Sequence, residues 1–498
     1  MASTVSANSY LPPFQDYCPK KRRRFVLIAA ILASAMGFID GSVVSIAIPS
    51  IRESLDASLT DAQWINNAYM LALSALILVG GAAGDRYGLK KLFSIGILLF
   101  VIASIACSFA TTPAMLIAAR AAQGIGAAIM VPGSLAIISK TYPKEDRARA
   151  IGIWAASSAL TTAVGPVLGG ALLSIGNPEL WRLIFAINLP VGAIALYLLV
   201  ARVPADEPVS DRPLDRQGAV LATLALGLLA WALTGPEGEE GLPDAGHMLV
   251  YGAAGLTALA AFLWAQHRTR HAMMPLRLFS VGEFSAANAV TFLLYFALSA
   301  VLFYLPMALI TGWDIPEAQV GLLFLPITVA VAAGSGLSGR LVERVGPAPL
   351  IGGGAALVAL AYGALALGFS WESFWGHIFP SMCLMGIGMA MVVAPLSASV
   401  MGSAPNDDSG AASGINNAVS RIAGLVAVAA MGGVASAAYL AADGPAGFGQ
   451  PVETALAGHR AATVAAFETI AWITALLCAL SSWIAFAFLP GKPAPAAP

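Results

Sequence analysis

The chain has 498 residues, of which 58% are hydrophobic and only 11% are charged, with a formal net charge of -1. Soluble domains carry about 25% charged residues, so this composition, with a mean hydropathy of +0.80, excludes an ordinary soluble protein and indicates a membrane protein with many helices. There is no phosphate-binding loop or nucleophile motif, and the five histidines have no metal-ligand spacing, so we expect neither an enzyme nor a bound metal.

Fourteen apolar runs are each long enough to cross a bilayer as a helix. They cover residues 25–50, 62–83, 91–110, 113–138, 149–174, 182–201, 214–234, 247–266, 284–310, 318–341, 349–369, 374–400, 410–440 and 464–489. The first run follows the basic segment 20–24. Beside a membrane span such a segment is typical of a cytoplasmic anchor, which fits better than a nucleic-acid patch, so no nucleic-acid partner is expected.

The distribution of basic residues tests the number of spans. With a cytoplasmic N-terminus, only Arg52, Arg182 and Arg460 fall on the outer side and Arg120 and Arg421 lie within spans, so the other 21 of 26 basic residues lie inside. One miscounted span would reverse every later loop and destroy this asymmetry. We therefore expect an integral protein of the inner or plasma membrane with fourteen spans and with both termini in the cytoplasm.

A short motif occurs twice in the chain, each time after the second span of one half. Its copies are Gly81-x-x-x-Asp85-Arg86-x-Gly88 and Gly339-x-x-x-Glu343-Arg344-x-Gly346. Two related six-helix halves with two inserted helices are typical of transporters built from repeats. The expected all-α chain is divided into a cytoplasmic tail 1–24, an N-terminal six-helix bundle 25–203, a two-helix insert 204–277, a C-terminal six-helix bundle 278–490 and a second tail 491–498.

Two opposite charges lie deep in the first half. Arg120 is seven residues into the fourth span and Asp40 about fifteen residues into the first. A charge at such a depth costs a few kcal/mol or more unless it faces protein or water. At 1.5 Å per residue, Asp40 lies about 15 Å and Arg120 about 10 Å below the same side of the membrane, so the two can share a layer. The pair is then either a structural salt bridge or a titratable site, and snorkelling is the alternative for Arg120 alone.

Polar side chains are expected near this pair. Gln123 shares the helix face of Arg120, and Asn66, Asn67 and Tyr69 of the second span lie in the same outer half of the membrane. We expect these four to line a substrate cavity, although lone polar residues in spans also serve as hydrogen bonds between helices.

Several of these segments resemble one family. The segment Arg120-x-x-Gln123-Gly124-x-Gly126-Ala127-Ala128 is similar to a signature of the major facilitator superfamily, in the helix implicated in proton coupling. Residues 39–49, 63–69 and 181–190 resemble the first, second and sixth helices of its fourteen-helix drug:proton antiporters. The resemblance implies a major facilitator fold, alternating access, and proton coupling through Asp40 and Arg120.

Two further motifs fit the same resemblance. The turn 81–93 is similar to the superfamily's cytoplasmic gating motif, which implicates Gly81, Asp85, Arg86, Gly88 and Lys90 in the gate. The resemblance places Asp85 against the start of the thirteenth span, where Asp407 and Asp408 already stand; for the basic residues of the turn, a role in topology alone is the alternative.

The fifth span carries the other motif. Gly165-Pro166-x-x-Gly169-Gly170 is similar to the antiporter motif of the fifth helix, with Thr161 in place of its first glycine. Proline bends a helix and glycine permits close helix contact, so a simple packing kink is the alternative.

We therefore expect a proton-driven exporter of small molecules that needs no cofactor besides the proton gradient. Its partners would be the substrate, protons and the lipid bilayer; the sequence does not determine whether a periplasmic adaptor and an outer-membrane channel take part. Asp40 is the only acid deep in a span, which favours cationic or neutral amphipathic substrates. A symporter or facilitator of the same fold and a non-transporting membrane receptor are the alternatives.

Overall fold

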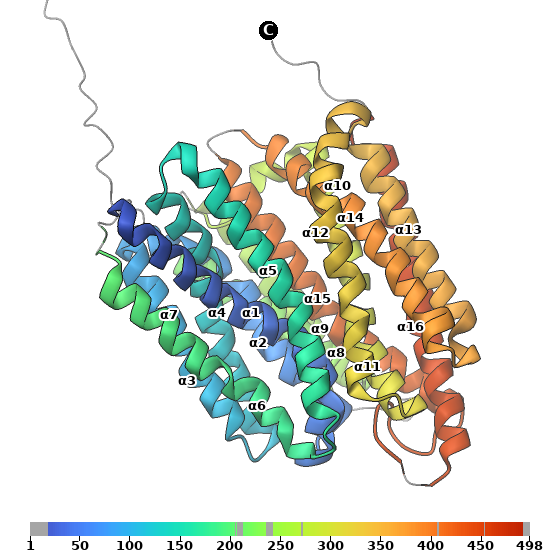
Figure 1. The fold of residues 1–498 in the computed structure, drawn as a ribbon. Helices are drawn as coiled ribbons and strands as arrows, with labels where there is room; N and C mark the ends of the chain where they lie inside the picture. Colours follow the sequence, from blue (N-terminus) through green and yellow to red (C-terminus); the bar gives the residue numbers. More distant parts are fainter. Residues whose placement is uncertain are drawn as a thin grey trace, which may run out of the picture.

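The computed structural model describes residues 18–204, 206, 213–235, 243–269, 272–405, 408–452 and 454–491. Within these ranges, fourteen helical segments are long and apolar enough to cross a membrane, and they stand side by side as one bundle (Figure 1). The all-α membrane fold and the number of spans expected from the sequence are confirmed. Most of the two expected tails, residues 1–17 and 492–498, lies outside the described residues, as does Asp407.

The first half contains six spans, the last of which is a helix pair. Its helices are α1 (Lys20–Leu55), α2 (Leu59–Tyr87), α3 (Leu89–Ser108), α4 (Pro113–Thr141), α5 (Lys144–Leu173), the turn η1 (Pro178–Leu180), α6 (Trp181–Ala186) and α7 (Asn188–Arg202). Within this half, α1 packs against α4, α5 and α7, while α2 and α3 pack against α4.

The insert and the second half follow. Their elements are α8 (Arg216–Leu233), α9 (Ala245–Arg268), η2 (Leu276–Ser280), α10 (Gly282–Met307), η3 (Ala308–Gly312), α11 (Glu317–Gly321), η4 (Leu322–Phe324), α12 (Leu325–Val345), α13 (Pro347–Gly368), η5 (Phe369–Trp371), η6 (Phe374–Ile378), α14 (Phe379–Gly402), α15 (Ser409–Ala441) and α16 (Leu456–Phe488). Here α10 packs against α15 and α16, and α14 packs against α12 and α13.

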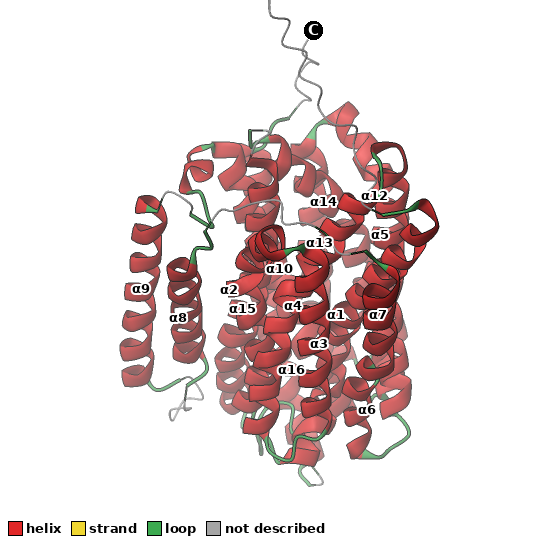
Figure 2. Ribbon diagram, turned by 90° about the vertical axis from the view of Figure 1, so that its left-hand side faces the viewer, coloured by secondary structure: helices red, strands yellow, loops and turns green. Residues whose placement is uncertain are grey.

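The inserted pair lies at the edge of the bundle. Figure 2 shows α8 and α9 beside each other, with α8 facing α2 and α15. The indole of Trp64 on α2 donates a hydrogen bond to Thr234 at the end of α8 (2.8 Å) and packs against Trp231. The insert is therefore held at the junction of the two halves without entering either one; the bounds of the five segments predicted from the sequence stay a prediction.

Matching glycines give the two halves the same packing. Gly124 and Gly126 on α4 touch the backbones of α2 and α3, and Gly386 and Gly388 on α14 touch those of α12 and α13, so closely that a Cβ would overlap backbone atoms. The repeated turns also share a geometry, because Gly88 and Gly346, which end them, have φ angles of 92° and 85°.

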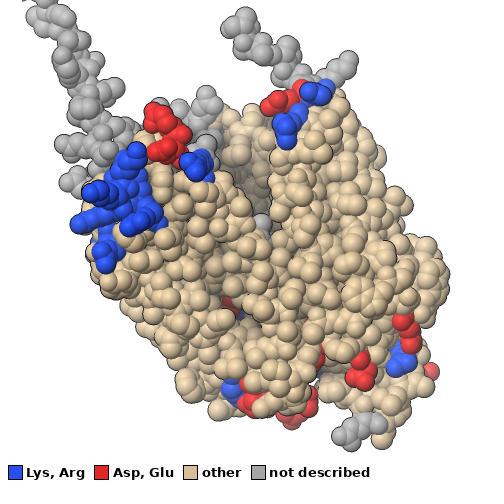
Figure 3. All heavy atoms as spheres, viewed as in Figure 1, with Lys and Arg blue, Asp and Glu red and all other residues tan. Residues whose placement is uncertain are grey.

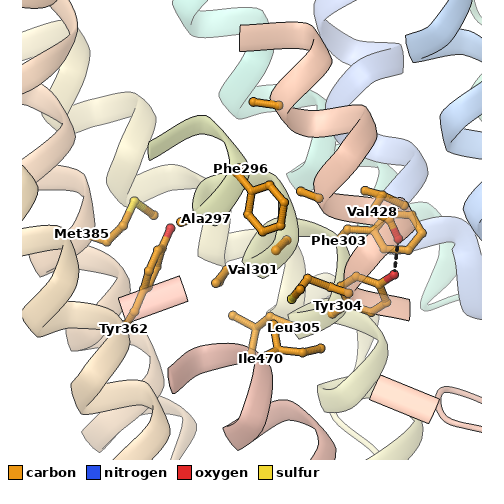
Figure 4. Close-up of a cluster of buried hydrophobic side chains, with 14 of the residues drawn as sticks. Phe296, Ala297, Val301, Phe303, Tyr304, Leu305, Tyr362, Met385, Val428 and Ile470 are labelled. Carbon is orange, nitrogen blue, oxygen red and sulfur yellow. Dashed lines mark hydrogen bonds between the residues drawn. The ribbon is translucent and has the colours of Figure 1, made fainter. Parts of the chain in front are cut away.

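The core of the second half is centred on α10. Phe296, Ala297, Val301 and Tyr304 project from this helix among side chains of neighbouring helices (Figure 4). The Tyr304 hydroxyl donates a hydrogen bond to the carbonyl oxygen of Val428 on α15 (2.6 Å). This bond fixes α10 to α15 on the side of the second half that faces the first.

Candidate transport site and gates

Asp40 and Arg120 form a buried ion pair between α1 and α4. Both residues are almost completely buried, with Arg120 0% and Asp40 1% exposed. Arg120 Nη1 donates to Asp40 Oδ2 and to Gln123 Oε1, and Gln123 Nε2 donates to Asp40 Oδ1 (2.9 Å). The Nε–H of Arg120 donates to the carbonyl oxygen of Ile65 on α2 (3.0 Å). Each carboxylate oxygen thus has a donor, as a buried charge requires.

A second set of hydrogen bonds holds Gln123 in place. The amide of Asn188 on α7 donates to Ser104 Oγ on α3 (2.9 Å), and Ser104 donates to the carbonyl oxygen of Phe185 (2.9 Å). Gln123 Nε2 lies 3.4 Å from the same Ser104 oxygen. Ser104 could not be singled out from the sequence, because a serine in an apolar helix usually bonds to the backbone of its own helix.

The central cavity lies between the two halves and has a volume of about 490 Å³. On α1, Phe38, Gly41, Ser42 and Ser45 line it, whereas Asp40 does not. Successive helix residues are about 100° apart, so Asp40 faces α4 while its neighbours face the cavity. The acid and the substrate space are adjacent but separate.

Of the four residues expected to line the cavity, the structure places two there. Asn66 and Tyr69 line it, but Gln123 and Asn67 do not, and both are completely buried within the first half. The prediction for Gln123 and Asn67 is therefore corrected. Gln123 turns toward Asp40, and Asn67 points about 100° away from Asn66 around α2.

The antiporter motif brings α5 against two other helices. A Cβ at Gly165 would lie 3.2 Å from the Ile39 Cα, and one at Gly169 would overlap the Val43 side chain, both on α1. Beyond them, a Cβ at Gly170 would overlap the carbonyl oxygen of Glu317 on α11. The carbonyl of Pro166 in turn fills the space beside Gly321. These residues thus join the halves near one end of the bundle.

That end is closed by polar contacts as well. We call it the opposite end, and the end that carries Lys20–Arg24 the basic end. Gln63 Nε2 on α2 donates to the carbonyl oxygens of Val428 and Ala429, the latter at 3.1 Å. Arg52 Nη1 on α1 donates to the carbonyl oxygen of Phe448, before α16 (2.7 Å). All three bonds run from the first half to the second.

The basic end is open between the halves. Figure 3 shows a hollow there, and in Figure 1 α5 and α12 diverge toward the same end. A Cβ at Gly152 on α5, or at Gly336 or Gly339 on α12, would meet nothing within 4 Å. The structure is therefore the conformation in which the cavity is accessible from the basic end.

The turn between α2 and α3 is held by an acid outside the predicted motif. The Asp206 carboxylate accepts hydrogen bonds from the backbone N–H of Leu89 (2.8 Å) and Lys90 (2.9 Å) and from Lys140 Nζ (2.8 Å). Burial acts to raise the pKa of Asp206, but these donors outweigh it and hold the pKa below its ordinary value of 3.8. Lys90 Nζ in turn donates to the carbonyl oxygens of Val200 and Val203 at the end of α7 (3.3 and 2.6 Å).

The other residues predicted for the gate lie around the same turn. Asp85 is exposed and makes no hydrogen bond or ion pair with the described part of α15, so the expected contact is not formed in this open conformation. Asp408, before α15, is instead paired with Arg277 (2.8 Å). Arg86 stacks on the ring of Tyr87, and Gly81 lies beside Pro132 of α4.

Comparisons with known proteins place the chain in a family. Residues 30–428 match the profile of the Major Facilitator Superfamily. The chain is 34% identical over 414 residues to the multidrug resistance protein Stp of Mycobacterium tuberculosis (strain CDC 1551 / Oshkosh). The aligned region covers 82% of this chain and 75% of that protein. The chain is also 31% identical over 415 residues to the tetracenomycin C resistance and export protein of Streptomyces glaucescens, with coverage of 82% and 74%.

A solved structure shares the fold. It is a bacterial homologue of the human lysosomal transporter Spinster in an inward-facing and unoccupied conformation, with a TM-score of 0.65, 20% identity, and coverage of 96% of this chain and 100% of that one. Together with the matching profile and the two relatives, the fourteen spans and the paired bundles establish that this chain belongs to the Major Facilitator Superfamily.

Proposed function

We propose that this protein exports small molecules across the inner or plasma membrane in exchange for protons by alternating access. The observation that carries the proposal is the position of Asp40, a titratable group buried next to the substrate cavity but not in it. The names of the two relatives, which concern drug resistance and export, support the outward direction.

The basic residues support the orientation. Loops rich in Lys and Arg remain on the cytoplasmic side of a membrane, and Lys20–Arg24, Lys90 and Lys140 lie at the basic end. The open hollow then faces the cytoplasm, where an exporter must collect its substrate. The contacts of Gln63 and Arg52 close the outer side in this conformation.

Protonation of Asp40 supplies the coupling. A proton on the Asp40 carboxylate removes its negative charge and leaves the buried Arg120 guanidinium without a counter-charge. A buried charge that has lost its partner costs about 3–5 kcal/mol. Once Asp40 is protonated, the conformation that buries Arg120 against it is therefore disfavoured. Because coupling between two ligands is reciprocal, a proton that favours one conformation also changes the affinity for substrate.

Everted membrane vesicles test the exchange. Substrate added outside vesicles with an acidic lumen should move into the lumen while protons leave it. A pH-sensitive dye in the lumen reports the resulting rise in pH, and vesicles without the protein are the control. A symporter would release protons only when substrate is loaded inside, and a receptor would release none. The same exchange in proteoliposomes of the purified protein would also show that no adaptor is required.

A further inference from the structure

Among the described residues that line the cavity, one side chain is charged, and it is positive. Arg421 lines the cavity from α15, twelve residues after the start of this helix at Ser409 and therefore about 18 Å along it. Asn417, Gly424 and Val428 lie on the same helix face and line the cavity too. A guanidinium in the middle of a span faces an aqueous or ligand-filled space rather than lipid.

The structure gives this guanidinium no partner of its own. Arg421 makes no hydrogen bond or ion pair with any described residue, and none of the described residues that line the cavity is Asp, Glu or Lys. Arg120, the other arginine within a span, is paired with Asp40 and also donates hydrogen bonds to Gln123 and Ile65. The two arginines thus differ: one is neutralised inside the first half, and the other offers its donors to whatever enters the cavity.

The rest of the cavity wall suits an aromatic body. Phe38, Tyr69, Tyr295, Phe303 and Phe324 line it from both halves. Aromatic walls with a few polar groups are typical of sites for amphipathic organic molecules. Arg presents a planar set of donors that matches a carboxylate in two parallel hydrogen bonds.

We propose that the cavity selects aromatic organic anions and that Arg421 binds their carboxylate or ionised phenol group. This inference rests on the proposed export function and names its substrate class. It replaces the preference for cationic or neutral amphipathic substrates, which assumed that Asp40 faces the substrate. Asp40 does not line the cavity, and its charge is neutralised by Arg120.

Binding to the purified full-length protein tests the inference without a proton gradient. Three probes share a naphthyl ring and differ in the charged or neutral group attached to it: the anion 1-naphthylacetate, the neutral 1-naphthylacetamide and the cation (1-naphthylmethyl)trimethylammonium. The wild-type protein should bind the anion roughly tenfold more tightly than the amide, because a hydrogen bond from a guanidinium to a charged oxygen is stronger than one to a neutral oxygen. The cation should bind most weakly, since Arg421 repels it.

Variants assign the preference to one side chain. Arg421→Gln should bind anion and amide equally, and Arg421→Lys, which keeps the charge, should retain the order of affinities with a smaller ratio. The control Arg268→Gln removes one exposed arginine from α9, outside the cavity, and should bind like wild type. Thermal unfolding of each purified variant identifies any that is misfolded.

The outcomes separate this inference from the export function. Equal binding of all three probes, tightest binding of the cation, no saturable binding of naphthylacetate, or an unchanged anion preference in Arg421→Gln would each overturn the role of Arg421. Absence of proton exchange in vesicles alongside an Arg421-dependent anion preference would instead overturn the export function and leave the binding site standing.

Discussion

The ring of Tyr69 lies between Arg120 and the central cavity. The guanidinium carbon of Arg120 is 4.3 Å from the ring centroid, and the same tyrosine lines the cavity. One side chain therefore contacts both the ion pair and the cavity where substrate would bind, and it connects the two physically.

This contact predicts that the ring of Tyr69 matters more than its hydroxyl, for which no hydrogen bond to the described residues is formed. Tyr69→Phe should keep the ratio of protons to substrate close to wild type. Tyr69→Leu removes a desolvated cation–π contact that contributes about 2 kcal/mol, and should lower both the thermal stability and that ratio in vesicles. Equal impairment of the two variants would show that the hydroxyl, not the ring, is required.

The ion pair predicts strong non-additivity. Arg120→Ala leaves the buried Asp40 carboxylate unpaired and should destabilise the protein by about 3–5 kcal/mol, measured as the thermal shift of the purified protein. Adding Asp40→Asn removes the unpaired charge, so the double variant should be more stable than Arg120→Ala alone. Simple addition of the two single effects would mean that the pair is not coupled in the native protein.

The proximity of Asp40 and Arg120 can be predicted from the sequence by helix geometry. Their depths follow from the rise per residue and the alternating direction of spans, and the basic residues fixed that direction. The rotation of each helix about its own axis, which decides which side chains face the cavity, cannot be predicted from the sequence in the same way. The sequence therefore predicts Gln123 and Asn67 in the cavity, whereas both side chains are buried among the helices of the first half.

Other parts of the site depend on distant contacts. Asp206 is one of several acids after the sixth span, and nothing in its neighbourhood indicates that it reaches the start of α3. Arg421 was recognised as a charge within a span, but its exposure to the cavity depends on how the two halves pack. The repeated turn glycines, Gly88 and Gly346, can in contrast be predicted from the sequence, because a turn with positive φ favours glycine at that position.

The contact of α5 with α11 predicts a conformational effect. Gly170→Ala places a methyl group against the carbonyl of Glu317 and should open the opposite end, lowering transport and increasing the labelling of cysteines introduced there. Gly152→Ala is the matched control on the same helix, because nothing lies within 4 Å of that position. Equal transport by the two variants would contradict a close α5–α11 contact in the transport cycle.

The Asp206 carboxylate predicts a pH-dependent contribution to stability. Its folded pKa lies below the ordinary value of 3.8, so the contribution is present above that value and is lost as the pH falls through the folded pKa. At about pH 7, Asp206→Ala should reduce stability by about 1–2 kcal/mol through loss of the helix cap. The difference in unfolding temperature from wild type should narrow below about pH 4; a difference independent of pH would exclude the charge as its cause.

The central claim is that Asp40 carries the coupled proton. Asp40→Asn keeps the size and much of the hydrogen bonding of the side chain but cannot titrate. In proteoliposomes with an imposed pH gradient, the wild-type protein should accumulate substrate against its concentration gradient. Asp40→Asn should exchange substrate between equal concentrations yet fail to accumulate it. Gradient-driven accumulation by Asp40→Asn at the wild-type level would contradict the account.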